Sequence, residues 1–272
     1  MINFPTCKIN LGLHVLSKRE DGFHEIETSM LEVPFTDAIE VSESDYDQFL
    51  SAGLTIPGNG NLCIEALQLM RKYHFIPPIS IELLKNIPMG GGLGGGSSDA
   101  AFTLKAINSY FELNLTTKKL EELASELGSD CPFFIQGGFQ SCTGRGEILA
   151  PIQLAIPSFY IVLLNFGIHV PTASAYQSIV PQSDRKSILE ILNQPKETWR
   201  KELVNDFEKP VYEKHPVLAQ IKNELYEKGA FYAAMSGSGS TLFGCFEHEP
   251  SESFRLLRPS IFEKMCLIQQ RK

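Results

Sequence analysis

Hydrophobic and polar residues follow two different periods along this chain. Alternating or continuous apolar runs, bounded by polar, Gly or Pro residues, predict β-strands. These runs cover residues 8–16, 25–31, 38–41, 79–84, 159–164, 231–235 and 241–246. Apolar residues spaced three and four positions apart predict helices over residues 61–72, 97–111, 116–127, 172–179, within 186–204, and 217–228. The chain therefore mixes strand and helix segments.

The predicted elements fall into two sets. The first two strands are joined by a polar turn at residues 17–22, which predicts a hairpin with a charged tip. A Pro-containing stretch at residues 150–157 then separates this first set from a second set, which begins with a strongly apolar strand. We therefore expect two domains, residues 1–155 and residues 156–272.

The composition limits the possible classes of function. The chain has 272 residues, 43% of them apolar and 21% charged, so it can bury a full core. A net charge of -8 without a large cluster of Lys and Arg argues against a nucleic-acid surface, and no run approaches the ~20 apolar residues that span a bilayer. The first ten residues lack a signal-peptide pattern, so we expect a cytoplasmic protein. Six cysteines without a C-x-x-C pair suggest neither a zinc knuckle nor a redox pair.

The strongest chemical signal is a glycine-rich segment between the predicted strand at 79–84 and the predicted helix at 97–111. Its residues are Pro88, Met89, Gly90, Gly91, Gly92, Leu93, Gly94, Gly95, Gly96, Ser97 and Ser98. Glycines let successive backbone N–H groups turn inward, and a helix N-terminus adds partial positive charge, so a phosphate fits there. A flexible linker is the alternative, but linkers seldom stand directly between an apolar strand and an apolar helix.

Three better-known nucleotide motifs fit this segment poorly. A Walker A loop needs Lys after its last glycine, whereas Ser97 follows Gly96. The Rossmann pattern G-x-G-x-x-G matches at Gly90, Gly92 and Gly95, but so dense a glycine run almost forces that match. The catalytic H-R-D and the D-F-G of a protein kinase are both absent from the sequence.

The glycine-rich segment instead resembles the second signature motif of the GHMP small-molecule kinases. Residues 7–11 resemble the first motif of that family, and residues 234–241 resemble its third. The three motifs lie in family order and span nearly the whole chain. The resemblance implies a two-domain α+β fold, with an N-terminal domain like ribosomal S5 domain 2, a ferredoxin-like C-terminal domain, and an active site in the cleft between them.

Further segments look most like the GHMP kinases that act on 4-diphosphocytidyl-2-C-methyl-D-erythritol. They are residues 8–11, 21–24, 61–62, 128–132 and 144–149. This resemblance implies ATP-dependent phosphorylation of the 2-hydroxyl of that substrate, in the non-mevalonate route to isoprenoid precursors. Arg145 departs from the small or aliphatic residue expected between Gly144 and Gly146. Its side chain is either an exposed stem or a contact to an anionic substrate.

Phosphoryl transfer to an alcohol requires a proton acceptor and a cation that stabilises phosphate charge. Asp130 is the candidate base and Lys8 the candidate cation, because a neighbouring ammonium would keep the carboxylate ionised. Spacing alone also allows Asp130 as a helix N-cap and Lys8 as a solvated strand charge. Asn10 lies two residues from Lys8, so on a strand both side chains point to one face.

The resemblance also assigns residues that would recognise the acceptor. Phe23 and His24 match positions that hold the cytosine ring by stacking and hydrogen bonding, and the family usually has Tyr in place of Phe23. Thr172 and Tyr176, four residues apart on a predicted helix, match positions that line the same pocket, so the Tyr176 ring could cover the base from its other side.

On the nucleotide side, the loop backbone with Ser97 and Ser98 is expected to contact the phosphates or Mg²⁺, and Asn61 is expected near adenine. Mg²⁺ is expected with ATP, but no carboxylate cluster identifies a protein ligand for it. Another acceptor (homoserine, mevalonate or a sugar), a non-catalytic nucleotide-binding protein and a dinucleotide-dependent oxidoreductase remain alternatives. We expect a small-molecule substrate, no nucleic-acid or membrane partner, and a monomer or homodimer.

Overall fold

The computed structural model describes residues 1–58, 60–154, 157–250 and 262–268. The chain divides into two compact units, each assembled from separate stretches. Unit 1 comprises residues 1–7, 35–89 and 94–137, and unit 2 comprises residues 8–34, 90–93 and 138–272. The predicted boundary at residues 155 and 156 lies outside the described residues, so the division into 1–155 and 156–272 stays a prediction.

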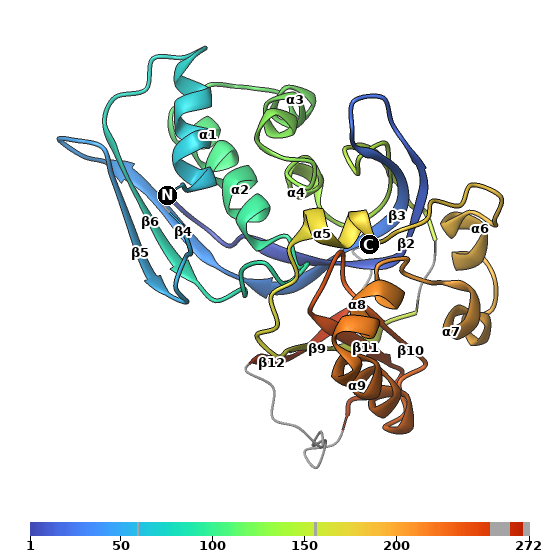
Figure 1. The fold of residues 1–272 in the computed structure, drawn as a ribbon. Helices are drawn as coiled ribbons and strands as arrows, with labels where there is room; N and C mark the ends of the chain where they lie inside the picture. The colour runs from blue at the N-terminus through green and yellow to red at the C-terminus, as the bar shows by residue number, and fades with distance from the viewer. Residues whose placement is uncertain (59, 155–156, 251–261, 269–272) are drawn as a thin grey trace. The chain divides into compact units, whose positions relative to one another are not determined.

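Unit 1 packs helices against a four-stranded sheet with the order β1-β4-β6-β5 (Figure 1). Its strands are β1 (Ile2–Asn3), β4 (Ala38–Glu43), β5 (Gln48–Gly53) and β6 (Ile79–Lys85). Its helices are α1 (Leu62–Arg71), α2 (Gly95–Tyr110), α3 (Thr117–Leu127) and α4 (Phe133–Gln136). The strand β4 pairs antiparallel with β1 and with β6, whereas β5 pairs parallel with β6.

Helix α2 connects the glycine loop to the core of unit 1. It packs against α1 and against β4. Its buried face carries small residues, among them Ala100, Ala101 and Ala106, which let neighbouring backbones come close. The capping residues of α1 and α3 are Asn61 and Thr116, whose side chains accept hydrogen bonds from the backbone N–H groups of Cys63 and Lys119.

Unit 2 contains two further four-stranded sheets, with the orders β2-β3-β7-β8 and β10-β11-β9-β12. The strands of the first sheet are β2 (Thr6–Lys18), β3 (His24–Thr36), β7 (Phe139–Thr143) and β8 (Ile148–Pro151). Those of the second are β9 (Phe159–Asn165), β10 (Tyr232–Met235), β11 (Leu242–Phe246) and β12 (Phe262–Ile268), all paired antiparallel. The helices are α5 (Thr172–Gln177), α6 (Ile188–Leu192), the 3-10 turn η1 (Lys196–Thr198), α7 (Trp199–Glu202), α8 (Glu208–Lys214) and α9 (Pro216–Glu227).

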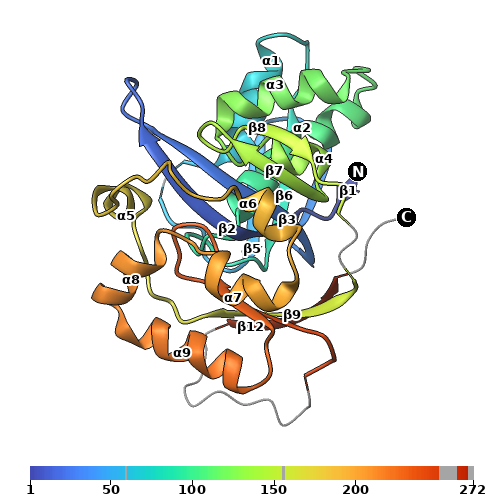
Figure 2. The same ribbon diagram turned by 90° about the vertical axis from the view of Figure 1, so that its right-hand side faces the viewer.

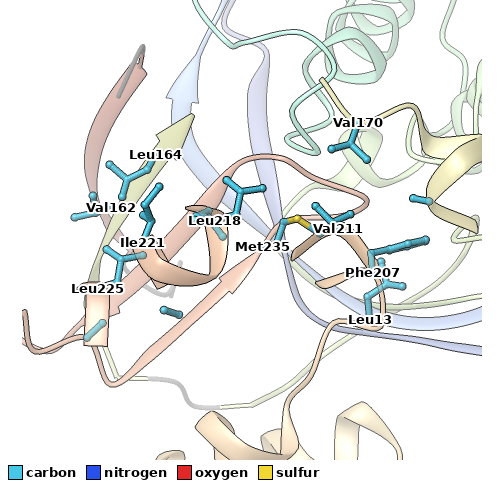
Figure 3. Packing of buried hydrophobic residues seen from close by; sticks show 14 of the residues in the cluster. Leu13, Val162, Leu164, Val170, Phe207, Val211, Leu218, Ile221, Leu225 and Met235 are labelled. Carbon is cyan, nitrogen blue, oxygen red and sulfur yellow. The ribbon is translucent and has the colours of Figure 1, made fainter. Parts of the chain in front are cut away.

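The hydrophobic core of unit 2 forms where α9 lies against the second sheet and α8 packs on α9 (Figures 1 and 2). Figure 3 shows Leu218, Ile221 and Leu225 of α9 close to Val162 and Leu164 of β9. The same cluster includes Leu13 and Val15 of β2, Phe207, Val211 of α8 and Met235 of β10. Strand β2, which carries the first motif, is therefore anchored in the core that also holds β10, which leads into the third motif.

The structure confirms the predicted α+β fold and the main periodic elements. The predicted hairpin is present as β2 and β3, which neighbour each other in one sheet. Sequence periodicity does not predict the short elements β5, β7, β8, β12, α4 and α8. These segments lack a clear apolar pattern, and most residues of β5, for example, are exposed. Across the described residues, no helix combines the length and apolar character needed to cross a membrane.

Candidate active site

The glycine loop uses backbone conformations that favour glycine. Gly90, Gly92 and Gly94 have positive φ angles of 65°, 80° and 71°. Gly94 is the N-cap of α2, and because it has no side chain, the first backbone N–H groups of the helix receive no side-chain cap. Uncapped N–H groups at the positive end of a helix dipole are suited to binding an anion.

Residues 90–93 of the loop pack directly against the third motif. The Ser236 hydroxyl donates to the carbonyl of Gly92 at 2.8 Å, and the Thr241 backbone N–H donates to the carbonyl of Gly91 at 3.1 Å. A Cβ atom at Gly92 would lie 2.0 Å from the carbonyl oxygen of Ser236. Only glycine therefore allows the two backbones to approach so closely.

The first motif joins the same cluster through the buried residues Lys8 and Asn10. The Lys8 ammonium donates to the Asn10 carboxamide oxygen at 2.7 Å, and the Asn10 amide donates to the Thr28 hydroxyl at 3.0 Å. The Ser236 hydroxyl also lies 3.4 Å from that Asn10 oxygen. In addition, the Lys8 backbone N–H donates to the Leu93 carbonyl at 3.0 Å. The first motif, residues 90–93 and the third motif thus form one hydrogen-bonded cluster within unit 2.

The predicted acceptor residues form two ring contacts in unit 2. His24 and Tyr176 stack with ring centroids 4.8 Å apart and an interplanar angle of 18°. Partial burial and the charge of Lys18 hold the pKa of His24 below its usual range, so its imidazole is biased toward the neutral form. Phe23, which is 52% exposed, instead lies beneath the guanidinium of Arg145, whose Cζ is 4.8 Å from the ring centroid. Arg145 is therefore more than an exposed stem, because its guanidinium makes a cation–π contact with the predicted recognition residue Phe23.

Thr172 begins α5 at the side of the third motif. Its hydroxyl lies 3.0 Å from that of Ser238. Tyr176 is on the same helix, and its ring also meets the ring of Phe207 edge to face, with centroids 4.8 Å apart. Thr172, Tyr176 and His24 therefore lie in the same unit as the third motif, and their assignment to one pocket stays a prediction.

Unit 1 holds the remaining predicted site residues. Asp130 lies in the turn between α3 and α4, and the N-cap of α4 is Pro132, so the alternative of Asp130 as the N-cap is wrong. Burial raises the pKa of the adjacent Cys131 thiol to about 12; a side-chain hydrogen bond with Ser97 opposes this shift and the charge of Asp130 adds to it, so the thiol is protonated. The Ser98 hydroxyl is fully buried and has no hydrogen-bond partner among the described residues.

Two other predicted nucleotide contacts have local structural roles. The Asn61 carboxamide oxygen accepts from the Cys63 backbone N–H at 2.8 Å as the N-cap of α1. Its predicted approach to adenine stays a prediction. Pro88 precedes the turn that begins at Met89, and the Met89 methyl lies 3.5 Å from the position of a Cβ at Gly96.

The sequence analysis did not predict a buried charged triad at the start of α2, formed by Lys85, Asp37 and Asp99. The Lys85 ammonium donates to Asp99 at 2.8 Å and to Asp37, and all three side chains are almost completely buried. Burial raises the pKa of Asp99 to about 7, although Lys85 opposes the shift. A Cβ at Gly95 would come within 2.9 Å of the Lys85 ammonium, so the triad packs directly against the first turn of α2.

The described residues contain no group of three or more His, Cys, Asp or Glu side chains that could hold a metal ion. Within the described residues, a divalent cation would therefore need further ligands from a bound nucleotide or from water. The buried triad does not change this conclusion, because the Lys85 ammonium already occupies the space between its two carboxylates.

Comparisons with known proteins place these motifs in a family. Residues 61–138 match the model of the GHMP kinases N terminal domain, and residues 180–255 match that of the GHMP kinases C terminal domain. The 4-diphosphocytidyl-2-C-methyl-D-erythritol kinase of Cytophaga hutchinsonii is 46% identical over 253 residues, which cover 92% of this chain and 94% of the relative. The enzyme of the same name from Parabacteroides distasonis is 46% identical over 249 residues, with 91% and 92% covered.

Solved structures agree with this assignment. A crystal structure of 4-(cytidine 5'-diphospho)-2C-methyl-D-erythritol kinase superposes with a TM-score of 0.75 at 33% identity, covering 90% of this chain and 89% of the other. Methanococcus jannaschii mevalonate kinase superposes with a TM-score of 0.68 at 16% identity and 90% coverage of each chain, which supports the shared fold alone. From its motifs and its relatives, the chain belongs to the GHMP kinases, in the family of the 4-diphosphocytidyl-2-C-methyl-D-erythritol kinases.

Proposed function

We propose that this protein transfers the γ-phosphoryl group of ATP to the 2-hydroxyl of 4-diphosphocytidyl-2-C-methyl-D-erythritol, giving the 2-phosphate and ADP. The step belongs to the non-mevalonate route of isoprenoid precursor synthesis. The observation that carries the proposal is the hydrogen-bonded cluster of Lys8, Asn10, Gly92 and Ser236, which joins three distant motifs. The 46% identity to relatives with this name over more than nine tenths of the chain supports the choice of acceptor.

In this reaction the glycine loop and the N-terminus of α2 bind the phosphates of ATP. Backbone N–H groups fixed by the loop geometry stabilise the charge that develops on the transferred group without having to reorganise. Asp130 accepts the proton of the 2-hydroxyl as it attacks the γ-phosphorus, and the Lys8 ammonium stabilises negative charge on the transferred phosphoryl group. Mg²⁺ enters with ATP as its complex, so MgATP is the donor.

The cytosine end of the acceptor is recognised by the aromatic residues of unit 2. His24 and Tyr176 are already in stacking contact, so we infer that the base stacks on an outer face of this pair rather than in a slot between the two rings. The neutral imidazole of His24 can donate one hydrogen bond and accept another, as reading a pyrimidine requires. Arg145 covers the ring of Phe23 and places a positive charge beside the base-recognition residues.

The test is release of ADP by the purified protein with MgATP and, separately, 4-diphosphocytidyl-2-C-methyl-D-erythritol, homoserine and mevalonate. We expect turnover with the cytidyl substrate alone. Asp130→Asn should lower kcat by about 100-fold or more, since it removes the proton acceptor. Asp45→Asn makes the same charge change at an exposed position of unit 1 and serves as the matched control.

Each other outcome points to a different function. Turnover with homoserine or mevalonate would retain the kinase fold but overturn the assignment of Phe23, His24 and Tyr176 to cytosine. Tight ATP binding without ADP release would indicate a nucleotide-binding protein that lacks catalysis. Equal kcat values for Asp130→Asn and Asp45→Asn would exclude Asp130 as the base.

A further inference from the structure

The segment between α7 and α8 contacts strand β2, the third motif and the aromatic pair of the proposed acceptor site, all within unit 2. Its backbone pairs with Leu13 of β2: the Leu13 N–H donates to the Val204 carbonyl, and the Asp206 N–H donates to the Leu13 carbonyl, both at 2.9 Å. Two of its side chains, Asn205 and Phe207, are 3% and 1% exposed. Neither has a role in the reaction described above.

Asn205 fixes the backbone of the third motif. Its side-chain amide donates to the carbonyl of Met235 at 2.7 Å and to the carbonyl of Gly237 at 2.8 Å. Its carboxamide oxygen accepts from the Phe207 backbone N–H at 3.0 Å, so the NH₂ group and the oxygen both have hydrogen-bond partners. The two carbonyl groups flank Ser236, whose hydroxyl reaches Gly92 and Asn10. One side chain thus holds both ends of the peptide segment that joins the three motifs.

Phe207 supports the aromatic pair of the proposed acceptor site. The edge of its ring meets Tyr176 at a centroid distance of 4.8 Å and an interplanar angle of 89°, and Tyr176 in turn stacks on His24. Figure 3 shows Phe207 near Leu13 and Val211 within the core of unit 2. The edge-to-face contact therefore ties the orientation of Tyr176 to a side chain that the core holds in place.

From these contacts we infer that Asn205 and Phe207 are positioning residues with separate tasks. Asn205 positions the third glycine motif for phosphoryl transfer, and Phe207 positions the Tyr176–His24 pair for binding the cytidyl group. The inference rests on the proposed function, since both tasks refer to that reaction. It predicts that two buried side chains only two residues apart affect different kinetic constants.

The test measures kcat and both KM values for Asn205→Ala and Phe207→Leu. Loss of the two hydrogen bonds should loosen the third motif, so we expect Asn205→Ala to lower kcat about 10-fold or more, with the KM of the cytidyl substrate changed less than about 2-fold. Loss of one aromatic contact should raise the KM of the cytidyl substrate by roughly 3- to 10-fold, with kcat and the KM of ATP nearly unchanged. Calorimetric binding of the cytidyl substrate without ATP should weaken in Phe207→Leu and not in Asn205→Ala.

Matched controls separate positioning from a general loss of stability. Asn193→Ala removes an exposed Asn that donates to a backbone carbonyl at 2.8 Å, and Phe159→Leu removes a buried ring that meets Phe231 edge to face. Both should lower the melting temperature without moving kcat or KM. If Asn205→Ala does not fold, Asn205→Ser, which keeps a donor, replaces it.

The outcomes distinguish the inference from the proposed function. If the wild-type protein does not turn over the cytidyl substrate, the proposed function fails and the inference fails with it. If the wild type is active but Asn205→Ala and Asn193→Ala have equal kcat values, Asn205 has no positioning role. If Phe207→Leu raises the KM of ATP as much as that of the cytidyl substrate, the assignment of Phe207 to the acceptor is overturned.

Discussion

The close approach of Gly92 to Ser236 allows a quantitative test of the loop structure. Gly92→Ala places a methyl group 2.0 Å from the Ser236 carbonyl oxygen, whereas ordinary contacts begin near 3.4 Å, so the two backbones must separate by about 1 Å or more. Overpacking of this kind costs about 1–3 kcal/mol, and a left-handed conformation costs an L-residue roughly 1–2 kcal/mol. We therefore expect the free energy of unfolding to fall by about 2–5 kcal/mol.

Two other glycines supply the controls for this prediction. Gly22 also has a positive φ, of 84°, but a Cβ there would meet nothing within 4 Å, so Gly22→Ala measures the conformational cost alone. Gly96 has no positive φ, and its Cβ would contact the Met89 methyl at 3.5 Å, so Gly96→Ala should be neutral or stabilising by up to about 1 kcal/mol.

The assay is urea unfolding followed by the fluorescence of Trp199, the single tryptophan of the chain, which lies in unit 2 with Gly92 and Gly22. For Gly96, which belongs to unit 1, circular dichroism gives the corresponding signal. The reasoning is refuted if Gly92→Ala and Gly22→Ala destabilise the protein equally, because the steric contact would then add nothing to the conformational cost.

Two further predictions concern buried charge. Burial lowers the pKa of His14 to about 4, with Arg185 lowering it further and Asp206 opposing, so the unfolded chain binds the proton first and stability falls as the pH drops from about 6.5 to about 4. A pKa shift from 6.5 to about 4 corresponds to roughly 3 kcal/mol, and His14→Leu should remove that pH dependence in urea titrations. An unchanged pH profile would contradict this prediction. Lys85→Met leaves the buried carboxylates of Asp37 and Asp99 without their cation. It should lower the free energy of unfolding by about 3–5 kcal/mol at pH 8, measured by circular dichroism. A loss below about 1 kcal/mol would mean that the carboxylates are not buried together as described.

The sequence predicted the fold best where the pattern is local. Periodic apolar residues were enough for the hairpin, for the strand before the glycine loop and for the helix after it. Strand alternation also predicted that Lys8 and Asn10 point to one face, and their side chains are hydrogen-bonded to each other. The contact of Ser236 with Gly92 could be expected only through the family resemblance, because 144 residues separate the two positions and no local rule relates them.

Long-range burial explains what the sequence did not predict. Lys85 ends a strand and would ordinarily be solvated, and only the fold shows that it neutralises two acidic residues inside unit 1. Asn205 carries no local signal that its side chain is buried, yet its amide donates to two backbone carbonyls and accepts one hydrogen bond in the interior. Asn61 fits both a helix cap and a nucleotide contact, and local geometry supplies only the first of these roles.

The interleaved construction of the two units has a consequence for biosynthesis. The hairpin of β2 and β3 leaves the ribosome early, but the strands β10 and β11 of the same unit follow about 200 residues later, roughly 10–40 s at ordinary translation rates. All segments of unit 1 are complete once residue 137 has been made. Strands β7 and β8 complete the sheet of the hairpin by residue 151, so unit 1 and this sheet can form first. The apolar side chains of β2 that pack with β10, such as Leu13 and Val15, then stay exposed on the nascent chain until residue 235 has been made, which makes them a binding site for chaperones.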